Sequence, residues 1–106
     1  MSDEKQYLVV FDVGTTAAKT IIFDIAGTFV GRVYQEYPTK TPSPGIVEQD
    51  PEEWWKAVKT SAKRALDLFK IDPKAVVGMS VTTQRATVAP IDKNARVLYP
   101  AMTWMD

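Results

Sequence analysis

The sequence of 106 residues contains no cysteine and no histidine. Without cysteine, the chain can form no disulfide, no thiolate nucleophile and no cysteine-ligated metal site. Without histidine, it can supply no Ser-His-Asp triad, no histidine general base and none of the usual histidine ligands of zinc. Any catalysis that uses this chain therefore depends on carboxylates, hydroxyls, lysine or arginine, or on a bound hard cation.

An excess of one charge and a long hydrophobic run are also lacking. Lys plus Arg equals Asp plus Glu, at 13 each, so no basic surplus indicates binding to nucleic acid or to an anionic membrane. No apolar run approaches the roughly 20 residues of a membrane-spanning helix. The polar residues 1–6 lack the apolar core of a signal peptide. We expect a soluble, cytoplasmic protein whose residues 1–6 are flexible.

The patterns that are present are typical of an α/β domain. Four segments rich in β-branched and aromatic residues are expected to be strands, namely residues 7–11, 21–23, 29–37 and 76–81. A helix is expected from Pro51 to about Lys70, with Asp50 as its cap and Glu53 in the capping-box position. Residues 92–94 read as the turn of a hairpin. This order predicts a mixed sheet with a crossover helix.

The spacing of apolar residues also predicts which faces are buried. The core side of the helix is expected to contain residues at helical spacing, namely Trp54, Val58, Ala62, Ala65, Leu66 and Phe69. Trp55 adjoins Trp54, so it cannot share that face and is expected to be partly exposed. A single helix covers only one face of the sheet, which leaves such apolar strands poorly buried. We therefore expect residues 7–106 to be part of a larger domain.

The segment between the first two predicted strands combines residues that suit the phosphates of a nucleotide. Gly14 lets the backbone approach a ligand closely, and successive N–H groups in a tight turn can bind an anion. Thr15 and Thr16 add hydroxyl donors, and Lys19 adds a positive charge. Asp12 offers an oxygen ligand for Mg²⁺. The segment is neither a Walker A loop nor a G-x-G-x-x-G fingerprint, and taken alone it also fits an ordinary turn.

Four segments, taken in order, resemble those of one enzyme family. Residues 12–16 are similar to the first phosphate motif of the actin, Hsp70 and sugar-kinase superfamily. Residues 44–51, with the sequence PGIVEQDP, resemble the segment before the first long helix of the FGGY carbohydrate kinases, the family of glycerol kinase and xylulokinase. Residues 78–85 resemble that family's strand ending in Gln-Arg, and residues 104–106 resemble its next pocket segment.

This resemblance implies the ribonuclease-H-like half of a two-domain kinase. ATP and Mg²⁺ would bind between the halves, and the γ-phosphoryl group would pass to a sugar or polyol hydroxyl. Asp12 would help to hold Mg²⁺, and the nucleotide contacts would be Asp12, Gly14, Thr15, Thr16 and Lys19. The substrate pocket would be lined by Gln84, Arg85, Trp104 and Asp106. The general base is expected outside this chain, so no catalytic residue is assigned here.

The same resemblance sets expectations for partners and leaves alternatives open. The expected partners are a small sugar or polyol and the remainder of the chain's own kinase, with no nucleic acid or membrane; a homo-oligomer is left open. Ala86 stands where glycerol kinases have a glutamate that binds substrate hydroxyls, which weakens the expectation of glycerol. Gln84 can instead hydrogen-bond the loop. The alternatives are a non-catalytic ribonuclease-H-like binding module and an actin- or Hsp70-like nucleotide switch.

Overall fold

Eight elements follow one another along residues 5–105, the part of the chain that this computed structural model describes. In order they are β1 (Tyr7–Val13), β2 (Ala17–Asp24), β3 (Phe29–Glu36), β4 (Glu48–Gln49), α1 (Pro51–Leu68), a short 3₁₀ helix (Pro73–Ala75), β5 (Val76–Thr83) and β6 (Ala101–Met102). The flexibility expected of residues 1–4 lies outside the described residues.

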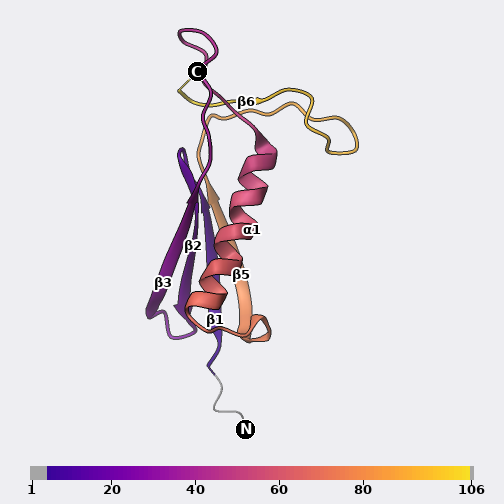
Figure 1. The fold of residues 1–106 in the computed structure, drawn as a ribbon. Helices are drawn as coiled ribbons and strands as arrows, with labels where there is room; N and C mark the ends of the chain where they lie inside the picture. Colours follow the sequence, from indigo (N-terminus) through magenta and orange to yellow (C-terminus); the bar gives the residue numbers. More distant parts are fainter. Residues whose placement is uncertain (1–4, 106) are drawn as a thin grey trace.

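The main sheet has the strand order β3-β2-β1-β5. β1 pairs antiparallel with β2 and parallel with β5, and β2 pairs antiparallel with β3. The predicted mixed sheet is thus confirmed, with α1 as the crossover between β3 and β5 (Figure 1). A second, two-stranded sheet joins β4 to β6, and the sequence pattern missed it because each strand is only two residues long.

Three strands are longer than their apolar runs predicted, and the first of them, β1, ends at Val13 and not at Phe11. β2 begins at Ala17 and not at Ile21, because its backbone pairs with β1 as far as Val13 opposite Ala18. β5 continues past Val81 to Thr83 for the same reason, beside the end of β1. The backbone ladder needs no apolar side chain, so polar residues at the strand ends were read as loop.

The predicted N-terminal cap of α1 is confirmed, but the capping box is not. The Asp50 carboxylate accepts the Glu52 N–H at 2.9 Å, and Pro51 occupies the first turn. The N–H of Glu53 bonds to the backbone carbonyl of Asp50 at 2.9 Å and not to its side chain. Glu52 and Glu53 both lie in the first turn, where negative charge complements the helix dipole.

Small residues let α1 pack closely on β2 and β3. The buried residues of the helix are Ala57, Ser61 and Ala65. Ala65 was predicted on this face, but Ser61 was not, because a pattern of apolar residues passes over a serine. The Ser61 hydroxyl bonds to that of Thr20 in β2 at 2.8 Å. At Gly31 in β3, an added Cβ would lie 2.1 Å from the Phe69 ring, so glycine is required for this contact.

The predicted packing of Trp54 and the predicted exposure of Trp55 are both confirmed. Trp54 packs against the small cluster of Ala18, Tyr37 and Ala57. Trp55 is exposed, and its ring carries the Lys59 ammonium 5.4 Å from the centroid. The hairpin turn is confirmed too, because Ile91 pairs with Val97 around residues 92–96.

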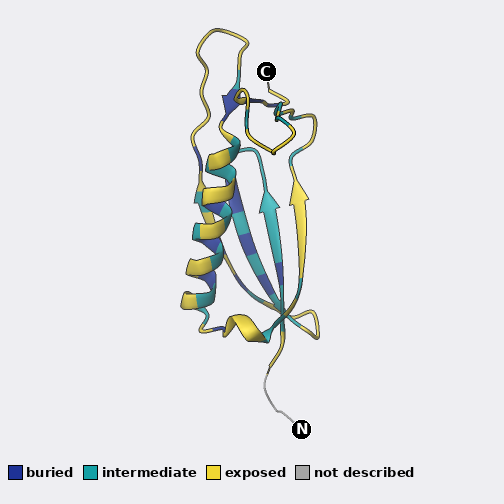
Figure 2. Ribbon diagram, turned by 90° about the vertical axis from the view of Figure 1, so that its right-hand side faces the viewer, coloured by how far each residue is buried: buried dark blue, intermediate teal, exposed yellow. Residues whose placement is uncertain are grey.

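Strand β5 is largely uncovered, unlike the other strands of the sheet (Figure 2). Val77, Met79 and Val81 are 49%, 72% and 61% exposed. The helix lies over β2 and β3, and the main core consists of Val9, Ile22, Val33, Ala65 and Ile71. That residues 7–106 form part of a larger domain stays a prediction.

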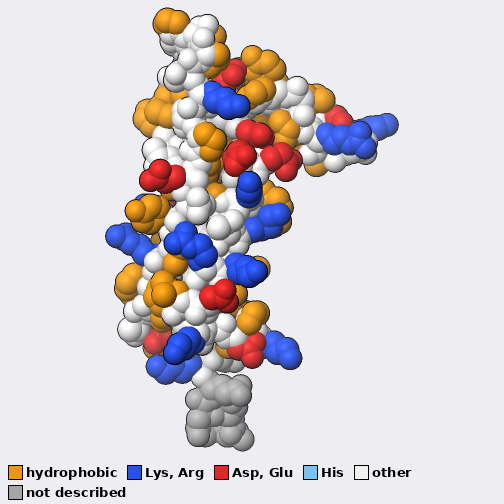
Figure 3. Space-filling model, in the orientation of Figure 1, with side chains coloured by type: hydrophobic (Ala, Val, Ile, Leu, Met, Phe, Trp, Pro, Cys, Tyr) orange, Lys and Arg blue, Asp and Glu red, His pale blue; other side chains and the backbone are white. Residues whose placement is uncertain are grey.

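The face seen in Figure 3 carries both signs of charge. In the view of Figure 3, Lys and Arg side chains are spread along the molecule with Asp and Glu between them. The molecule is elongated, with extents of 57 × 28 × 21 Å. No helix among the described residues is both long and apolar enough to cross a membrane.

Candidate functional site

Segments far apart in the sequence meet at one end of the main sheet. β1 and β5 are parallel, so their carboxyl ends lie at the same edge, and the Gln84 N–H donates to the Val13 carbonyl at 2.9 Å. The start of α1 and the β4–β6 pair lie at this end as well (Figure 1). Here the fold brings together the β1–β2 loop, residues 14–16, and the segment that follows β5.

The carbonyl groups of the β1–β2 loop are held by donors from within the protein. The Gly14 N–H donates to the Ala17 carbonyl at 3.0 Å, which closes the turn. The Tyr37 hydroxyl bonds to the Gly14 carbonyl and lies 3.2 Å from that of Ala17. The Tyr37 N–H donates to the Thr16 carbonyl at 3.2 Å.

The remaining loop carbonyl, that of Thr15, is held by Gln49. This side chain is 1% exposed, and its Nε2 donates to the Thr15 carbonyl at 2.7 Å and to the Thr39 hydroxyl at 2.8 Å. Its Oε1 accepts the indole N–H of Trp54 at 2.9 Å and the Gln84 Nε2 at 3.0 Å. Gln49 therefore uses all of its donors and both acceptor positions.

The backbone N–H groups of Thr15 and Thr16 have no acceptor among residues 5–105. Thr16 is exposed and Thr15 is half-buried, so these two donors face solvent beside four paired carbonyls, where they can receive an acceptor from a ligand. Neighbouring N–H groups in a turn of this kind form an anion-binding concavity. The loop can therefore bind an anionic group such as a phosphate.

Asp12 and Lys19 lie beside this loop on the sheet face opposite α1. They are directly opposed on β1 and β2, and Thr82 on β5 is the other neighbour of Asp12. An added Cβ at Gly14 would lie 3.8 Å from the Asp12 carboxylate, which shows how close that carboxylate is to the loop. The carboxylate, the ammonium and the loop donors thus lie along one edge of the site.

A cation at this site would take most of its ligands from water and phosphate and few from acidic side chains. Within residues 5–105, no group of three or more His, Cys, Asp or Glu side chains could hold a metal. Mg²⁺ in phosphate sites binds through one or two carboxylates, with water and phosphate oxygens as further ligands. Asp12 can provide such a carboxylate, but it could not by itself hold a structural metal ion.

Burial keeps the Tyr37 phenol neutral. Its side chain is buried, and this burial, together with the negative charge of Asp12, raises the pKa of Tyr37 to about 12. The phenol is therefore a hydrogen-bond donor throughout the physiological pH range. It holds the Gly14 and Ala17 carbonyls in the same way at any pH at which the protein operates.

The predicted substrate residues divide into two kinds. Trp104 is 55% exposed, and its indole N–H donates to the Thr15 hydroxyl at 3.0 Å. Arg85 is exposed, and its guanidinium has no partner within the described part of the chain. Gln84 is half-buried, and its side chain bonds to Gln49 and to the Thr87 hydroxyl, so it is used in hydrogen bonds within the protein. Asp106 lies outside the described residues.

The position after Arg85 has an unusual backbone. Ala86 has a φ of 53°, in the left-handed region that few residues other than glycine adopt. Its side chain is exposed, so a longer side chain at this position has solvent space to enter. The turn at Ala86 directs the following residues away from the end of β5.

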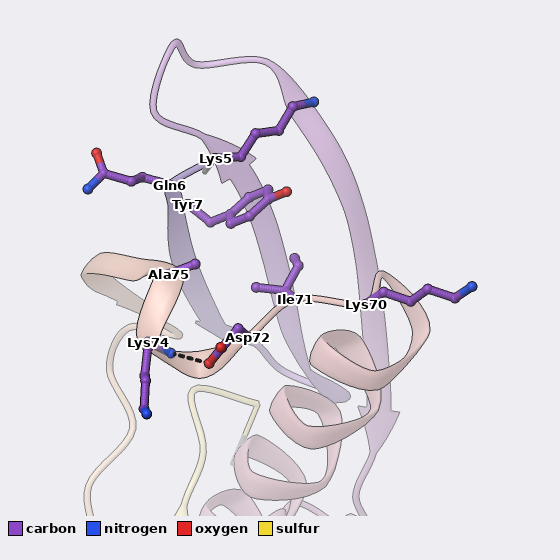
Figure 4. A pocket seen from close by; sticks show the side chains of 8 residues that line it. All are labelled: Lys5, Gln6, Tyr7, Lys70, Ile71, Asp72, Lys74 and Ala75. Carbon is purple, nitrogen blue, oxygen red and sulfur yellow. Dashed lines mark hydrogen bonds between the residues drawn. The ribbon is translucent and has the colours of Figure 1, made fainter. Parts of the chain in front are cut away.

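A cavity of about 760 Å³ lies at the other end of the sheet, beside the start of β1. It is lined in part by Lys5, Lys70 and Lys74, but their ammonium groups point in different directions (Figure 4). The Asp72 carboxylate there caps the Lys74 N–H at 2.9 Å. These groups do not converge on a common ligand position, and the predicted site residues that the structure describes all lie at the opposite end.

Sequence reasoning missed Gln49, Tyr37 and Thr39. Tyr37 was predicted as the last residue of the third strand, although β3 ends at Glu36, and a strand pattern does not reveal which carbonyl a hydroxyl reaches. Gln49 belongs to the Glu-Gln-Asp-Pro segment that carried part of the family resemblance. Its position directly before the helix cap Asp50 was the available signal. The burial that obliges its polar groups to find partners is visible only in the structure.

The fold and this site together define a class of protein. A ribonuclease-H-like mixed sheet, with a phosphate-type loop between its first two strands, is the architecture of the sugar kinases of the actin and Hsp70 superfamily. The chain belongs to the FGGY family of carbohydrate kinases, whose N-terminal domain matches residues 7–106.

Relatives and solved structures agree with this membership. The chain is 38% identical over 100 residues to a glycerol kinase from Thermococcus gammatolerans, covering 94% of this chain and 20% of that protein. A xyloylose kinase structure from Brucella ovis superposes with a TM-score of 0.90 at 30% identity, covering 95% of this chain and 21% of that one. A gluconate kinase structure from Lactobacillus acidophilus gives 0.88 at 30% identity, covering 97% and 20%. The chain therefore spans about a fifth of the length of these relatives.

Proposed function

We propose that this chain supplies the phosphate-binding loop and one side of the acceptor pocket of an ATP-dependent sugar or polyol kinase. The observation that carries the proposal is the inward pairing of all four carbonyls of residues 14–17, beside the unpaired N–H groups of Thr15 and Thr16. Transfer of a phosphoryl group depends mainly on positioning and charge stabilisation. A loop of fixed donors suits that task.

The named residues take separate roles in this proposal. Thr15 and Thr16 donate N–H groups, and Thr16 also a hydroxyl, to phosphate oxygens. Lys19 balances negative charge on the phosphates from the open face of the sheet. Asp12 is the residue that would hold Mg²⁺, and the bound ion would neutralise charge on the nucleotide phosphates.

The acceptor side is formed by Trp104 and Arg85. The Trp104 ring is open to solvent while its N–H is bound to Thr15, so its exposed face can pack against the carbon chain of a sugar or polyol. The Arg85 guanidinium offers donors in a planar fork to hydroxyl groups. The bond from Trp104 to Thr15 supports the proposal that the acceptor binds next to the phosphate loop.

The residue at position 86 bears on which acceptor is used. Glycerol kinase and two kinases of other carbohydrates are among the relatives. Ala86 provides no carboxylate acceptor for substrate hydroxyls, so we propose an acceptor other than glycerol. Ala86→Glu is expected to raise activity on glycerol relative to other acceptors, because the left-handed backbone and the Cβ are already present at this position.

The test is ADP release from Mg²⁺-ATP by the polypeptide translated to the natural stop codon of its gene. The assay covers a panel of polyols, ketoses and aldoses, with Asp12→Asn as the inactive control. Stimulation by one compound, absent in the control, would establish the activity and identify the acceptor. ATP hydrolysis that ignores every acceptor would favour a nucleotide switch, and ATP binding without turnover would favour a binding module.

A further inference from the structure

Gln49 lies between the phosphate loop and the acceptor side of the site. It donates to the Thr15 carbonyl on one side and accepts from Gln84, the neighbour of Arg85, on the other. At 1% exposure, water does not compete for these bonds. Because all of its donors and acceptors are used, Gln49 cannot change one partner without breaking a bond to another.

The same residue also locates Trp104. Gln49 is paired with Ala101 across the β4–β6 sheet, and the Trp104 indole donates to the Thr15 hydroxyl three residues further along. Thr15 is thus held at its carbonyl by Gln49 and at its hydroxyl by Trp104. A shift of the acceptor side would move Thr15, and a shift of Thr15 would move the acceptor side.

We propose that Gln49 is a positioning residue that couples nucleotide binding at the phosphate loop to acceptor binding beside Arg85. It touches neither ligand; it keeps the Thr15 carbonyl turned inward, so that the neighbouring N–H groups face outward. This inference rests on the proposed function, because it assigns the two sides of the site to nucleotide and acceptor. Coupling of this kind is reciprocal, so each ligand changes the affinity of the other by the same factor.

Gln49→Glu, made in the full-length polypeptide, tests the donors of this side chain separately from its acceptors. The variant has nearly the same shape and keeps acceptors for Trp54 and Gln84, but as a carboxylate it cannot donate to Thr15 or Thr39. We expect KM for Mg²⁺-ATP to rise about 10-fold to 100-fold, as when a supporting hydrogen bond behind a ligand group is lost. The factor by which the acceptor tightens ATP binding should fall from above one in the wild type to about one.

The introduced carboxyl also provides an internal rescue. Burial raises the pKa of such a group, so lowering the pH from about 8 to about 6 protonates it. The protonated form regains one O–H donor, which can bond to the Thr15 carbonyl. The rise in KM should therefore shrink at the lower pH for Gln49→Glu, and it should not shrink for Gln49→Met, which has no donor at either pH.

Trp54→Phe is the matched structural control. It removes one of the four bonds to Gln49 but leaves the bond to Thr15 intact, so it should lower Tm and leave KM for ATP unchanged. If Gln49→Glu only lowers Tm, with KM and the coupling factor within about twofold of wild type, the inference is wrong. A wild-type coupling factor of one would also overturn it.

Direct binding distinguishes this inference from the proposed function. If the wild type binds Mg²⁺-ATP but phosphorylates no acceptor, the proposed function fails. Titration calorimetry with Mg²⁺-ATP then still tests the loop side of the inference: affinity about 10-fold weaker in Gln49→Glu supports it, and equal affinity overturns it. If the wild type binds no Mg²⁺-ATP, both proposals are wrong.

Discussion

The two ends of the main sheet contain similar residues but differ in how their polar groups are arranged. At the carboxyl end of β1, the loop carbonyls, Gln49 and Tyr37 form a connected set of hydrogen bonds, much of it buried. At the opposite end, lysines around a cavity of about 760 Å³ point in different directions (Figure 4). Convergence of donors, and not the size of a cavity, therefore distinguishes the candidate site.

The two ends of the β1–β2 hairpin region also contain one aspartate each. Asp24 closes its turn by accepting the N–H groups of Ala26 at 3.0 Å and Thr28 at 2.9 Å. Asp12 has no such role, and its carboxylate lies next to Gly14. One carboxylate stabilises a turn, and the other is free to serve a ligand. Tyr37 and Tyr34, and likewise Lys19 and Lys74, also pair a residue at the candidate site with one of the same type away from it.

The largest expected effect separates the two aspartates. Asp12→Asn should lower acceptor-dependent ADP release on the order of 100-fold, as when a preorganised charge-stabilising group is removed. Asp24→Asn keeps a side-chain oxygen for its turn, so it should change the rate by less than about twofold. Steady-state kinetics on both variants measures the contrast. Equal losses in the two variants would mean that the hairpin acts only as a structural unit.

The next effect concerns the stability that Tyr37 gives to the loop. Tyr37→Phe removes the hydroxyl from the buried Gly14 and Ala17 carbonyls and should lower the free energy of unfolding by about 1–3 kcal/mol. Tyr34→Phe, at an exposed position of β3, should change it by less than about 0.5 kcal/mol. Urea unfolding monitored by circular dichroism gives both values. Similar losses at both positions would show that the Tyr37 hydroxyl contributes no more to the free energy of unfolding than an exposed tyrosine hydroxyl does.

Tyr37 also predicts a pH dependence of stability. Its pKa is raised from 10.0 to about 12 in the folded protein, so the unfolded state loses this proton first. The stability from Tyr37 is complete below about pH 10 and is lost as pH rises through about 12, by about 2–3 kcal/mol. The wild type should therefore lose more stability than Tyr37→Phe between these pH values. Parallel unfolding curves for the two proteins would contradict the assigned pKa.

The smallest expected effect compares one lysine at each end of the sheet. Lys19→Gln should raise KM for ATP about fivefold, because it removes a partly solvated cation beside the phosphate loop. Lys74→Gln, at the opposite cavity, should change it by less than about twofold. A larger effect at Lys74 would show that the cavity beside the start of β1 takes part in nucleotide binding.

The sequence by itself determined most of the elements and supplied most of the candidate site residues, whose roles stay predictions. Alternating and helical spacing identified the sheet and α1, because burial of apolar side chains follows the period of each element. Turn chemistry located the β1–β2 loop, and local motifs singled out Asp12, Thr15, Arg85 and Trp104. Each of these features is written in a short stretch of neighbouring residues.

Only the tertiary structure decided how these pieces meet. The bond from Trp104 to Thr15 joins residues 89 positions apart, and Gln49 joins Thr15 to Gln84 through a buried amide. Hydrogen bonds act over about 3 Å and depend on angle, so no spacing in the sequence reveals which groups come into range. The parallel pairing of β1 with β5 and the pairing of β4 with β6 brought them together, beside a loop whose carbonyls turn inward and whose Thr15 and Thr16 N–H groups face outward.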